Sequence, residues 1–366
     1  MNILFLTTHL NTGGITSYLL TLGKGLVSRG HTVYVCSSGG NMEKIFSEAG
    51  IKLVKVDLKT KSVLNPKLYF LLPKLKKIIL KYHIQVIHAH TRVTQFVGQM
   101  LSSPELPLVT TCHGFFKPRF FRRLFPCWGQ KVIAISPAVY DHLRRDFSVS
   151  QTNIALVPSG IDLSEFIVIN DQDRVFQRKQ LNVPEDVVVL GMIARLSDVK
   201  GQDILIEAMR EVVVPGPKVH LLIAGEGKME PKLRAMVKQY QLDDHISFYS
   251  VASRTLDLLA ALDILVVPSR MEGLGLSILE AQAAAVPVVA SRVGGIVSLI
   301  EDQKTGFLAE PGNSRDLAKV LINVISREDR GKSVGLSGRD FVIKAKFLEK
   351  MIEETERVYY EVIGKK

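Results

Sequence analysis

The sequence predicts two doubly wound α/β domains in series, each built on a parallel sheet with helices on both faces. Three observations lead to this prediction. The chain has 366 residues, more than a single hydrophobic core usually organises. Short runs of Val, Ile and Leu alternate with amphipathic segments, the pattern of buried parallel strands joined by helices. A polar stretch at residues 169–184 interrupts the alternation, which then begins again.

The first half of the chain opens directly on an apolar strand. Residues 2–8 have no basic segment before them and therefore do not resemble a signal peptide. The further strands expected in this half are residues 32–36, 52–56, 85–89, 108–112, 131–135 and 154–157. The helices expected between them are residues 16–28, 42–49, 67–82, 94–101 and 137–147.

The second half repeats the alternation after the polar stretch, which we interpret as a linker and the entry to the second domain. Its expected strands are residues 187–193, 219–224, 246–249, 264–267, 286–290 and 306–309. Its expected helices are residues 203–213, 230–239, 255–261, 277–284, 295–300, 315–326 and 339–362. Ligands of such sheets bind beyond the carboxyl ends of the strands, so we expect a ligand between the two domains.

Composition is that of an ordinary folded protein, with 46% hydrophobic and 23% charged residues. No segment reaches the ~20 apolar residues that a membrane-spanning helix needs. Cys36, Cys112 and Cys127 show neither CxxC pairing nor metal-ligand spacing, so we expect reduced thiols.

The net charge of +11 lies in the first half. Residues 1–170 contain 20 basic and 8 acidic side chains, which indicates an anionic partner for this half. One basic cluster is residues 52–81. The second, residues 117–125, suits an anionic membrane surface or acceptor because it interleaves cations with aromatic rings. Its members are Lys117, Arg119, Phe120, Phe121, Arg122 and Arg123. A solvated charged face over a few core aromatic residues is an equally open interpretation.

Two carboxylates, Glu272 and Glu280, mark the most informative turn of the chain. The turn after strand 264–267 consists of Glu272, Gly273, Leu274, Gly275 and Leu276. Its glycines permit a tight turn, and the unpaired N–H groups at the start of the following helix attract phosphate. The neighbouring carboxylates accept hydrogen bonds from hydroxyl groups. The segment therefore predicts a ligand that joins a phosphate to a polyol, such as a nucleotide-sugar.

Three further segments that follow strands are expected to converge on the same ligand. Gly13 and Gly14 permit close approach of the backbone to an anion, although a purely structural turn is an open alternative. Arg195 and Lys200 combine a planar fork with a point charge, which suits a diphosphate, unless both are simply solvated loop cations. His113, beside a glycine at a strand end, places an imidazole nearby, although a lone His is more often structural.

Two other patterns do not lead us to a metal site. His88 and His90 form an HxH pair that lacks a nearby third ligand. Asp171 and Asp173 have the DxD form, but they lie in the linker without a preceding strand. We therefore expect no bound metal ion.

Together these segments resemble the retaining glycosyltransferases of the GT-B fold, specifically glycosyltransferase family 4 (group 1). The resemblance extends over essentially the whole chain. Besides the early glycine pair and the Glu272/Glu280 motif, it includes Thr111-Cys-His-Gly114, Val157-Pro-Ser-Gly-Ile-Asp162, Ala194-Arg-Leu-Ser197, Lys200-Gly201, Ala224-Gly-Glu-Gly227 and Val293-Gly-Gly295. Ser159 replaces the Asn that is usual in the family, and Ser serves such a turn as well.

The resemblance implies two Rossmann-like domains that face each other across a cleft. Residues 1–168 would bind the acceptor and residues 169–340 the nucleotide-sugar donor. A helix at about residues 341–366 would pack back on the first domain.

The resemblance also implies residue roles. Arg195 and Lys200 would neutralise the diphosphate, with backbone N–H groups near Gly14 and from Gly275 to Leu276. Glu280 would bind the ribose hydroxyls and Glu272 the hydroxyls of the donor sugar, while His113 would contact the donor sugar near the reacting carbon.

The expected activity is retaining, metal-independent transfer of a hexosyl group to a lipid-linked or cell-envelope glycan acceptor of the lipopolysaccharide or glycolipid type. No cofactor is expected beyond the co-substrate, with a UDP-sugar favoured over a GDP- or ADP-sugar. The protein would be cytoplasmic and peripheral on the cytoplasmic face of the inner membrane. Open alternatives are a soluble acceptor, a sugar-nucleotide epimerase and, outside enzymes, a basic nucleic-acid-binding protein, for which no recognisable motif is present.

Overall fold

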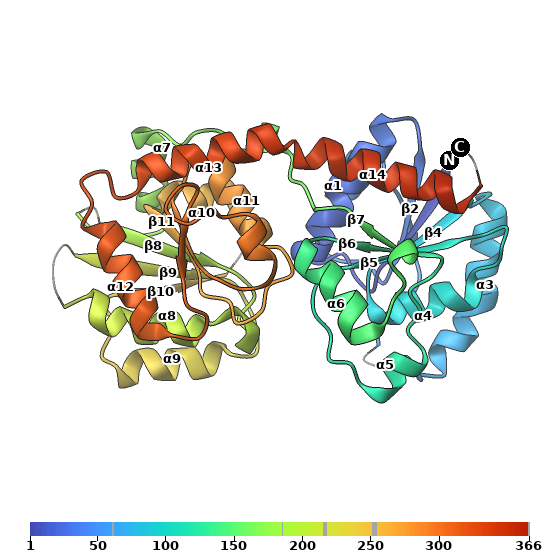
Figure 1. Ribbon diagram of the computed structural model, residues 1–366, viewed down its shortest axis with the longest axis horizontal. Helices are drawn as coiled ribbons and strands as arrows, with labels where there is room; N and C mark the ends of the chain where they lie inside the picture. Colours follow the sequence, from blue (N-terminus) through green and yellow to red (C-terminus); the bar gives the residue numbers. More distant parts are fainter. Residues whose placement is uncertain (61, 185, 215–217, 251–254, 365–366) are drawn as a thin grey trace. The chain divides into compact units, whose positions relative to one another are not determined.

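The computed structural model describes residues 1–60, 62–184, 186–214, 218–250 and 255–364. The chain divides into two compact units, Met1–Ile161 with Phe347–Lys366, and Asp162–Lys346 (Figure 1). The first crossing between units therefore lies after Ile161, ahead of the expected boundary at residue 168. The second crossing lies after Lys346, later than the expected residue 340.

The first unit is built on a seven-stranded parallel sheet in the order β3-β2-β1-β4-β5-β6-β7. All seven expected strands are confirmed: β1 (Asn2–Leu6), β2 (Thr32–Ser37), β3 (Lys52–Lys55), β4 (Val86–Ala89), β5 (Leu108–Cys112), β6 (Lys131–Ala134) and β7 (Ile154–Leu156). Most of their side chains are fully buried, as expected for apolar strands covered on both faces.

The helices of this unit follow the expected alternation, with one addition. They are α1 (Gly14–Ser28), α2 (Glu43–Glu48), α3 (Lys67–Lys81), α4 (Arg92–Leu101), α5 (Phe120–Leu124), α6 (Pro137–Phe147) and α14 (Phe347–Val362). The addition is α5, a short helix within the aromatic and basic segment 117–125.

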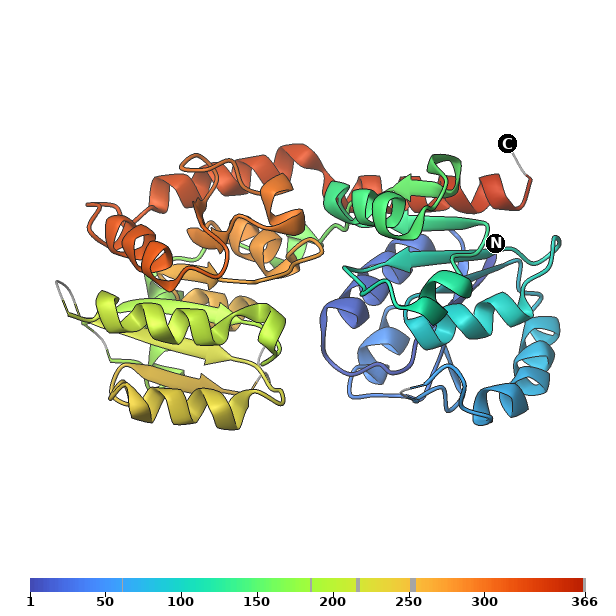
Figure 2. The ribbon, with the colours of Figure 1, turned by 60° about the horizontal axis from the view of Figure 1, so that its bottom comes forward.

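The second unit is built on a six-stranded parallel sheet in the order β10-β9-β8-β11-β12-β13. Its strands are β8 (Val188–Ile193), β9 (Val219–Ala224), β10 (Ile246–Tyr249), β11 (Ile264–Val267), β12 (Val288–Ser291) and β13 (Phe307–Ala309). Its helices are α7 (Asp171–Gln180), α8 (Gln202–Val212), α9 (Glu230–Gln239), α10 (Thr255–Ala261), α11 (Leu276–Ala283), α12 (Ser314–Ile325) and α13 (Lys332–Ala345). Helices α8, α9 and α12 pack on one face, whereas α7, α10, α11 and α13 pack on the other (Figures 1 and 2).

Three expectations about elements of the second half need correction. The polar stretch 169–184 is not a free linker, because it contains α7, which packs on α10. The helix expected at residues 295–300 is the 3₁₀ helix Gly294–Ser298. The single helix expected at 339–362 is two helices, because Lys346 adopts a left-handed conformation (φ 50°) between α13 and α14. Of the terminal segment 341–366, residues 365–366 lie outside the described part.

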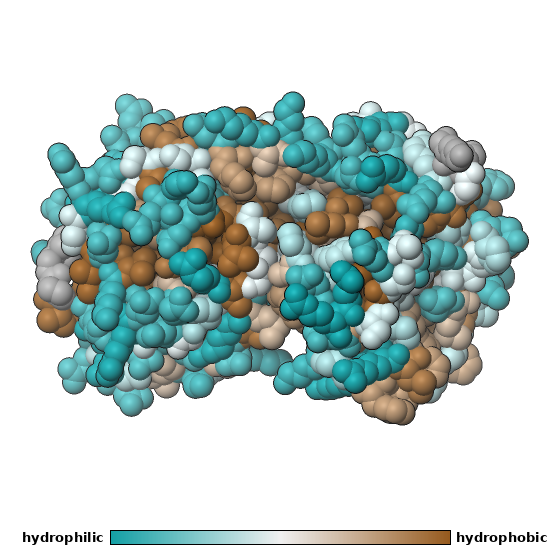
Figure 3. Space-filling view, viewed as in Figure 1, coloured by the Kyte–Doolittle hydropathy of each residue, from teal (hydrophilic) through white to brown (hydrophobic). Residues whose placement is uncertain are grey.

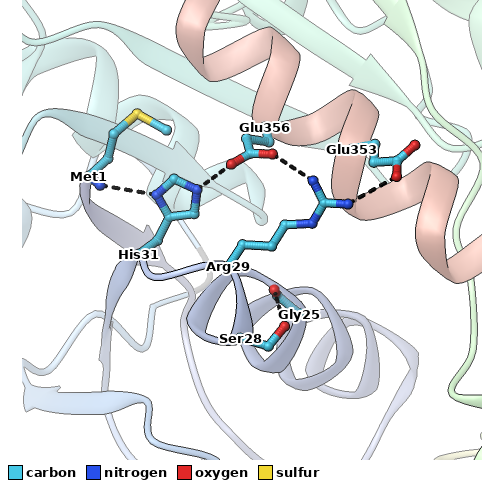
Figure 4. A network of polar contacts seen from close by, with 7 residues as sticks. All are labelled: Met1, Gly25, Ser28, Arg29, His31, Glu353 and Glu356. Atoms are coloured by element: carbon cyan, nitrogen blue, oxygen red, sulfur yellow. Dashed lines mark hydrogen bonds and ion pairs between the residues drawn. The ribbon is translucent and has the colours of Figure 1, made fainter.

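Helix α14 is fastened to the first unit by a network of polar contacts (Figure 4). Arg29 donates to Glu356 at 2.9 Å and to Glu353 at 3.0 Å. His31 places Nε2 2.6 Å from the second oxygen of Glu356, while the Met1 amino group donates to His31 Nδ1 at 3.0 Å. The last helix of the chain is thus an integral part of the first unit.

Candidate functional site

The main candidate site lies where the strand order of the second sheet reverses. Strand β8 stands between β9 and β11, so the connections after β8 and β11 leave the sheet on opposite sides. Such a switch point at the carboxyl ends of parallel strands is the usual place for a ligand. The segment with Arg195 and Lys200 follows β8, and the turn from Glu272 to Leu276 follows β11.

Lys200 and Glu272 meet at this switch point. Lys200 Nζ lies 2.7 Å from Glu272 Oε2, and the two side chains are 26% and 12% exposed. The same carboxylate oxygen accepts a hydrogen bond of 3.0 Å from the hydroxyl of the buried Ser269. The two residues were expected to bind the same ligand, and the structure places them in direct contact.

Arg195 is an exposed cation at the end of β8. Within the described residues its guanidinium forms no hydrogen bond or ion pair, so it is available to an anion. Its backbone is held in place, since the buried Gln202 side chain donates to its carbonyl at 2.9 Å.

A second ion pair ties the two loops together. Arg270, directly ahead of the Glu272 turn, forms a bidentate pair with Asp203 at 2.7 and 2.8 Å. It also donates to the carbonyl of Asp198 at 2.9 Å. A fork against a carboxylate fixes both distance and orientation, so this pair holds the β8 loop against the β11 loop. Neither residue belongs to a motif that the sequence displays, and only spatial proximity reveals the pair.

Two glycines make the close approach of these loops possible. Gly201 has φ 74°, and a Cβ there would lie 2.0 Å from the carbonyl oxygen of Pro268. Gly275 has φ 103° and immediately precedes α11. Both values lie where residues with a Cβ are strained.

The turn after β11 places the first residues of α11 at the switch point. Gly273, Leu274 and Gly275 are buried, and Leu276 begins the helix. The first N–H groups of a helix lack partners within it, and together with the helix dipole they attract anions. With Arg195 and Lys200, the start of α11 therefore gives the switch point three sources of positive potential, which would suit a phosphate-bearing ligand.

Glu280 stands on α11 in a partly buried position. Burial, and secondarily the negative charge of Glu165, raises the pKa of the Glu280 carboxyl to about 7. A carboxyl in such an environment is poised between its acid and its charged form near neutral pH, as is common in functional sites.

Replacement of Glu280 by Gln is expected to stabilise the second unit increasingly as pH rises. Because the folded-state pKa is raised from 4.5 to about 7, folding favours the protonated carboxyl. The native protein thus loses stability between those two pH values, and the Gln variant does not. Urea unfolding midpoints of both proteins at pH 5, 6, 7 and 8 measure this effect. A constant difference across the series would contradict the raised pKa.

The first unit carries the remaining residues expected at the site. Gly13 caps α1 and Gly14 is its first residue, directly after the β1 loop. One turn further on, the ring of Tyr18 meets the His113 ring edge to face at a centroid distance of 4.8 Å. Tyr18 thus links α1, the helix that the glycine pair begins, to His113 at the carboxyl end of β5.

A buried polar cluster surrounds His113. His90 Nδ1 lies 3.3 Å from His113 Nε2, and the His88 ring lies 4.1 Å from the His90 ring. His88 is held by the Thr111 hydroxyl at 2.7 Å and the Tyr359 hydroxyl of α14 at 2.6 Å. Burial lowers the pKa of His113 to about 3, and lowers the pKa values of His88 and His90 well below their ordinary value. All three rings are thus neutral at pH 7.

His88, the first residue of the HxH pair, and the DxD pattern have structural roles in this fold. Both nitrogens of His88 are occupied by hydroxyl groups, as described above. Asp171 and Asp173 lie in the first turn of α7, where carboxylates interact favourably with the helix dipole. In the part of the chain that the structure describes, no group of three His, Cys, Asp or Glu side chains is arranged to hold a metal ion.

Some side chains of the aromatic and basic segment 117–125 are exposed, and at least one is buried. Phe120 and Phe121 of α5 are 74% and 61% exposed, and apolar side chains gather over α5 in Figure 3. Lys117, Arg119 and Arg123 are also exposed.

The expectation that Arg122 belongs to this surface was wrong, because its side chain is buried. Its guanidinium lies 4.2 Å from the Trp128 ring centroid and donates to Gln95 Oε1 at 3.0 Å. Burial lowers the pKa of Arg122 to about 9. The Arg122 side chain anchors α5 to the rest of the unit. The interleaving of basic and aromatic residues in segment 117–125 did not reveal that this side chain points inward.

Comparison with known proteins matches both halves of the chain to models of glycosyltransferases. The model for "Glycosyltransferase Family 4" matches residues 12–165, and the model for "Glycosyl transferases group 1" matches residues 173–340. The two models thus match successive parts of the chain, in the order of its two units.

Individual relatives agree with these matches. The chain is 23% identical over 383 residues to N-acetyl-alpha-D-glucosaminyl L-malate synthase of Bacillus anthracis, covering 98% of this chain and 96% of that protein. It is 33% identical over 193 residues to GDP-mannose-dependent monoacylated alpha-(1-6)-phosphatidylinositol monomannoside mannosyltransferase of Corynebacterium glutamicum, covering 51% and 50%. The structure of Anabaena HepE in complex with UDP and glucose matches with a TM-score of 0.86 at 22% identity, over 99% of this chain and 100% of that one. The structural match establishes a shared fold.

Proposed function

Because this chain belongs to the group 1 glycosyltransferases of family 4, which have the GT-B fold, we propose that it is a retaining, metal-independent hexosyltransferase. Its donor is a nucleoside diphosphate sugar, and its acceptor is a lipid-linked or cell-envelope glycan of the lipopolysaccharide or glycolipid type. Family membership favours a transferase over the epimerase and nucleic-acid-binding alternatives.

The observation that carries the proposal is the convergence of positive potential at the β8/β11 switch point. Arg195, Lys200 and the start of α11 suit the diphosphate of a donor. Breaking the bond between sugar and phosphate moves negative charge onto the leaving diphosphate. Fixed cations and N–H dipoles aimed at that charge lower the barrier without reorganising during the reaction.

The carboxylates and His113 complete the assignment of roles. Glu272, held by Lys200 and Ser269, binds hydroxyls of the donor sugar, and Glu280 binds those of the ribose. His113 contacts the sugar near its reacting carbon. These residues need not include a protein nucleophile. The bond between the sugar and the phosphate breaks, and the acceptor oxygen bonds to the sugar carbon from the same face. The leaving phosphate takes the proton of the acceptor hydroxyl.

The donor KM is expected to rise as pH falls below about 7. An ionised Glu280 accepts hydrogen bonds from ribose hydroxyls more strongly than a protonated one, and its pKa is raised to about 7. Between pH 8 and pH 6 the ionised fraction falls by about 10-fold, and KM rises by up to that factor. Steady-state kinetics across this range test the effect. Glu280→Gln abolishes the pH dependence, and Glu165→Gln moves it to lower pH; an unchanged profile in both variants would reject the role of Glu280.

The acceptor proposal rests on α5 and on one relative. Exposed phenylalanines beside Arg119 and Arg123 suit insertion at an anionic lipid surface. The Corynebacterium relative is named for a monoacylated phosphatidylinositol monomannoside. Among the described residues, no helix is both long and apolar enough to span a bilayer. We propose peripheral attachment at the cytoplasmic face of the inner membrane.

A soluble acceptor is the second candidate. It is favoured by the Bacillus anthracis relative, which matches 98% of this chain, since that enzyme is named for L-malate. A UDP-sugar is the proposed donor, in line with the UDP bound in the Anabaena structure. The Corynebacterium name, which specifies GDP-mannose, keeps GDP-sugars in the test.

Nucleotide release from a panel of UDP-, GDP- and ADP-sugars, with and without bacterial lipid extract, tests the proposal. We expect release from one donor that rises with lipid and disappears in Glu280→Ala, with the anomeric configuration of the product read by NMR. Release that is independent of lipid would favour the soluble acceptor, and an inverted linkage would contradict retention. No release from any donor would remove the proposed activity.

Replacing both Arg119 and Arg123 by Ala is expected to weaken binding to anionic vesicles by about 30-fold. Each basic residue near an anionic surface contributes about 1 kcal/mol. Co-sedimentation with phosphatidylglycerol vesicles measures the loss, and Phe120→Ser with Phe121→Ser should weaken binding independently of salt. The matched control replaces Arg144 and Arg145 on α6, which are also exposed. Equal losses in control and test would show attraction by net charge alone.

A further inference from the structure

His90 has only one partner for its two ring nitrogens. Its Nδ1 lies 3.3 Å from His113 Nε2. Its Nε2 is buried and has no hydrogen-bond partner among the described residues. The ring is 2% exposed, and the rings of Phe5, Tyr18 and His88 pack around it. Protein side chains therefore fix the orientation of His90 and bury its Nε2.

The position of one proton on His90 determines the position of the proton on His113. A neutral imidazole carries one N–H and one lone pair. If His90 is protonated on Nδ1, it donates to His113 Nε2, and its own Nε2 is an unpaired buried acceptor. If His90 is instead protonated on Nε2, a buried N–H has no acceptor, and Nδ1 must accept from His113.

The first arrangement is favoured, since buried donors without a partner are rarer than buried acceptors without one. His113 Nε2 is then an acceptor, and the single proton of His113 resides on Nδ1. The charge state is fixed by burial, which lowers the pKa of His113 to about 3 and that of His90 well below its ordinary value.

We propose that His90 is a positioning residue that holds His113 as the Nδ1–H tautomer, so that His113 presents a hydrogen-bond donor to the nucleotide-sugar. The functional part of this inference rests on the proposed function, whereas the tautomer itself does not. The second residue of the HxH pair thereby acquires a role in the reaction.

This tautomer limits what His113 does in catalysis. A neutral ring that donates through Nδ1 and accepts from His90 through Nε2 has no free lone pair for an acceptor hydroxyl. His113 therefore does not remove the acceptor proton. It stabilises an oxygen of the donor by donating a hydrogen bond, and that oxygen lies in the sugar or its diphosphate.

Long-range ¹H–¹⁵N spectra of the full chain labelled with ¹⁵N-histidine at pH 7 test the tautomer directly. The signals of His113 and His90 are assigned by comparison with His113→Gln and His90→Asn. We expect His113 Nδ1 to be protonated and Nε2 to have the shift of an unprotonated nitrogen. Protonation of His113 on Nε2 would overturn the proposal. This reading needs no activity, so it stands even when no donor is turned over.

Two variants of His90 separate positioning from packing. His90→Phe keeps a ring but removes the donor, so His113 should lose its fixed tautomer and kcat should fall by on the order of 10-fold. His90→Asn returns an N–H at the δ position and should restore the tautomer and most of kcat. His220→Phe, which removes another buried histidine in the second unit, is the matched control. An unchanged His113 spectrum in His90→Phe would contradict the positioning role. If His90→Phe does not fold, the tautomer of His113 in the wild-type spectrum is the test.

Discussion

Replacing Lys200 by Ala is expected to lower kcat by about 10²–10³-fold. Lys200 Nζ lies at the switch point of the second sheet, 2.7 Å from Glu272 and on the same loop as Arg195. Removing it takes away a fixed charge that opposes the negative charge developing on the leaving diphosphate. It also leaves Glu272, which is only 12% exposed, without its cation. Steady-state kinetics with the preferred donor measure the loss.

The matched control for Lys200 is Lys304→Ala. Lys304 also pairs with a glutamate, Glu301, but both side chains are more than 60% exposed. Exposed pairs of this kind contribute little, so the control should retain full activity and stability. Lys200→Arg keeps the charge and should recover part of kcat. If Lys200→Ala turned over donor at the wild-type rate, the diphosphate site would have to lie elsewhere.

Replacing Asp263 by Ala is expected to destabilise the second unit by about 3–5 kcal/mol. The carboxylate, 9% exposed, receives Arg178 at 2.7 Å and Arg174 at 3.0 Å, and also accepts from the backbone N–H of Val189 at 2.8 Å. Its removal takes the only anion paired with two largely buried arginines in the described residues, which keep backbone carbonyls as acceptors, and leaves the N–H of Val189 without its side-chain partner. Urea unfolding that follows the second unit measures the change.

The control for Asp263 is Glu301→Ala, which breaks an exposed pair in the same unit. It should change stability by less than about 0.5 kcal/mol. Asp263→Asn keeps the shape and part of the hydrogen bonding, so its cost should fall between the two. A cost for Asp263→Ala no larger than for Glu301→Ala would mean that α7 is not held through this carboxylate.

The Asp263 cluster also shows why the linker expectation failed. Residues 169–184 are polar, and in sequence such a stretch resembles a connection between domains. The arginines of α7 bind an acceptor almost ninety positions away along the chain, and no local pattern reveals that partner. The strands were predictable for the opposite reason: runs such as Val188–Ile193 must be buried wherever they lie.

The break between α13 and α14 was hidden for a related reason. Helices usually end at Gly or Pro, which leave a visible signal. Here the left-handed residue is Lys346, and the amphipathic pattern continues on both sides of it. The chain nevertheless passes from one unit to the other at this residue.

The candidate site was predicted in its parts but not in its contacts. Glycines, cations and carboxylates after strands are visible in sequence, so Lys200 and Glu272 could be named. That they pair, and that Arg270 and Asp203 clamp the two loops, depends on which loops meet at the switch point. The inward direction of Arg122 likewise depends on aromatic partners outside its own segment.

The central claim is that the loops after β8 and β11 form a nucleoside diphosphate site. Titration calorimetry of UDP, GDP and ADP into the wild-type chain, Lys200→Ala and Lys304→Ala tests it most directly. We expect one nucleotide to bind saturably to the wild type and to the Lys304 variant, with UDP the proposed one, and binding to be lost or strongly weakened in the Lys200 variant. The same Kd in all three proteins, or no binding of any nucleotide to the wild type, would contradict the account.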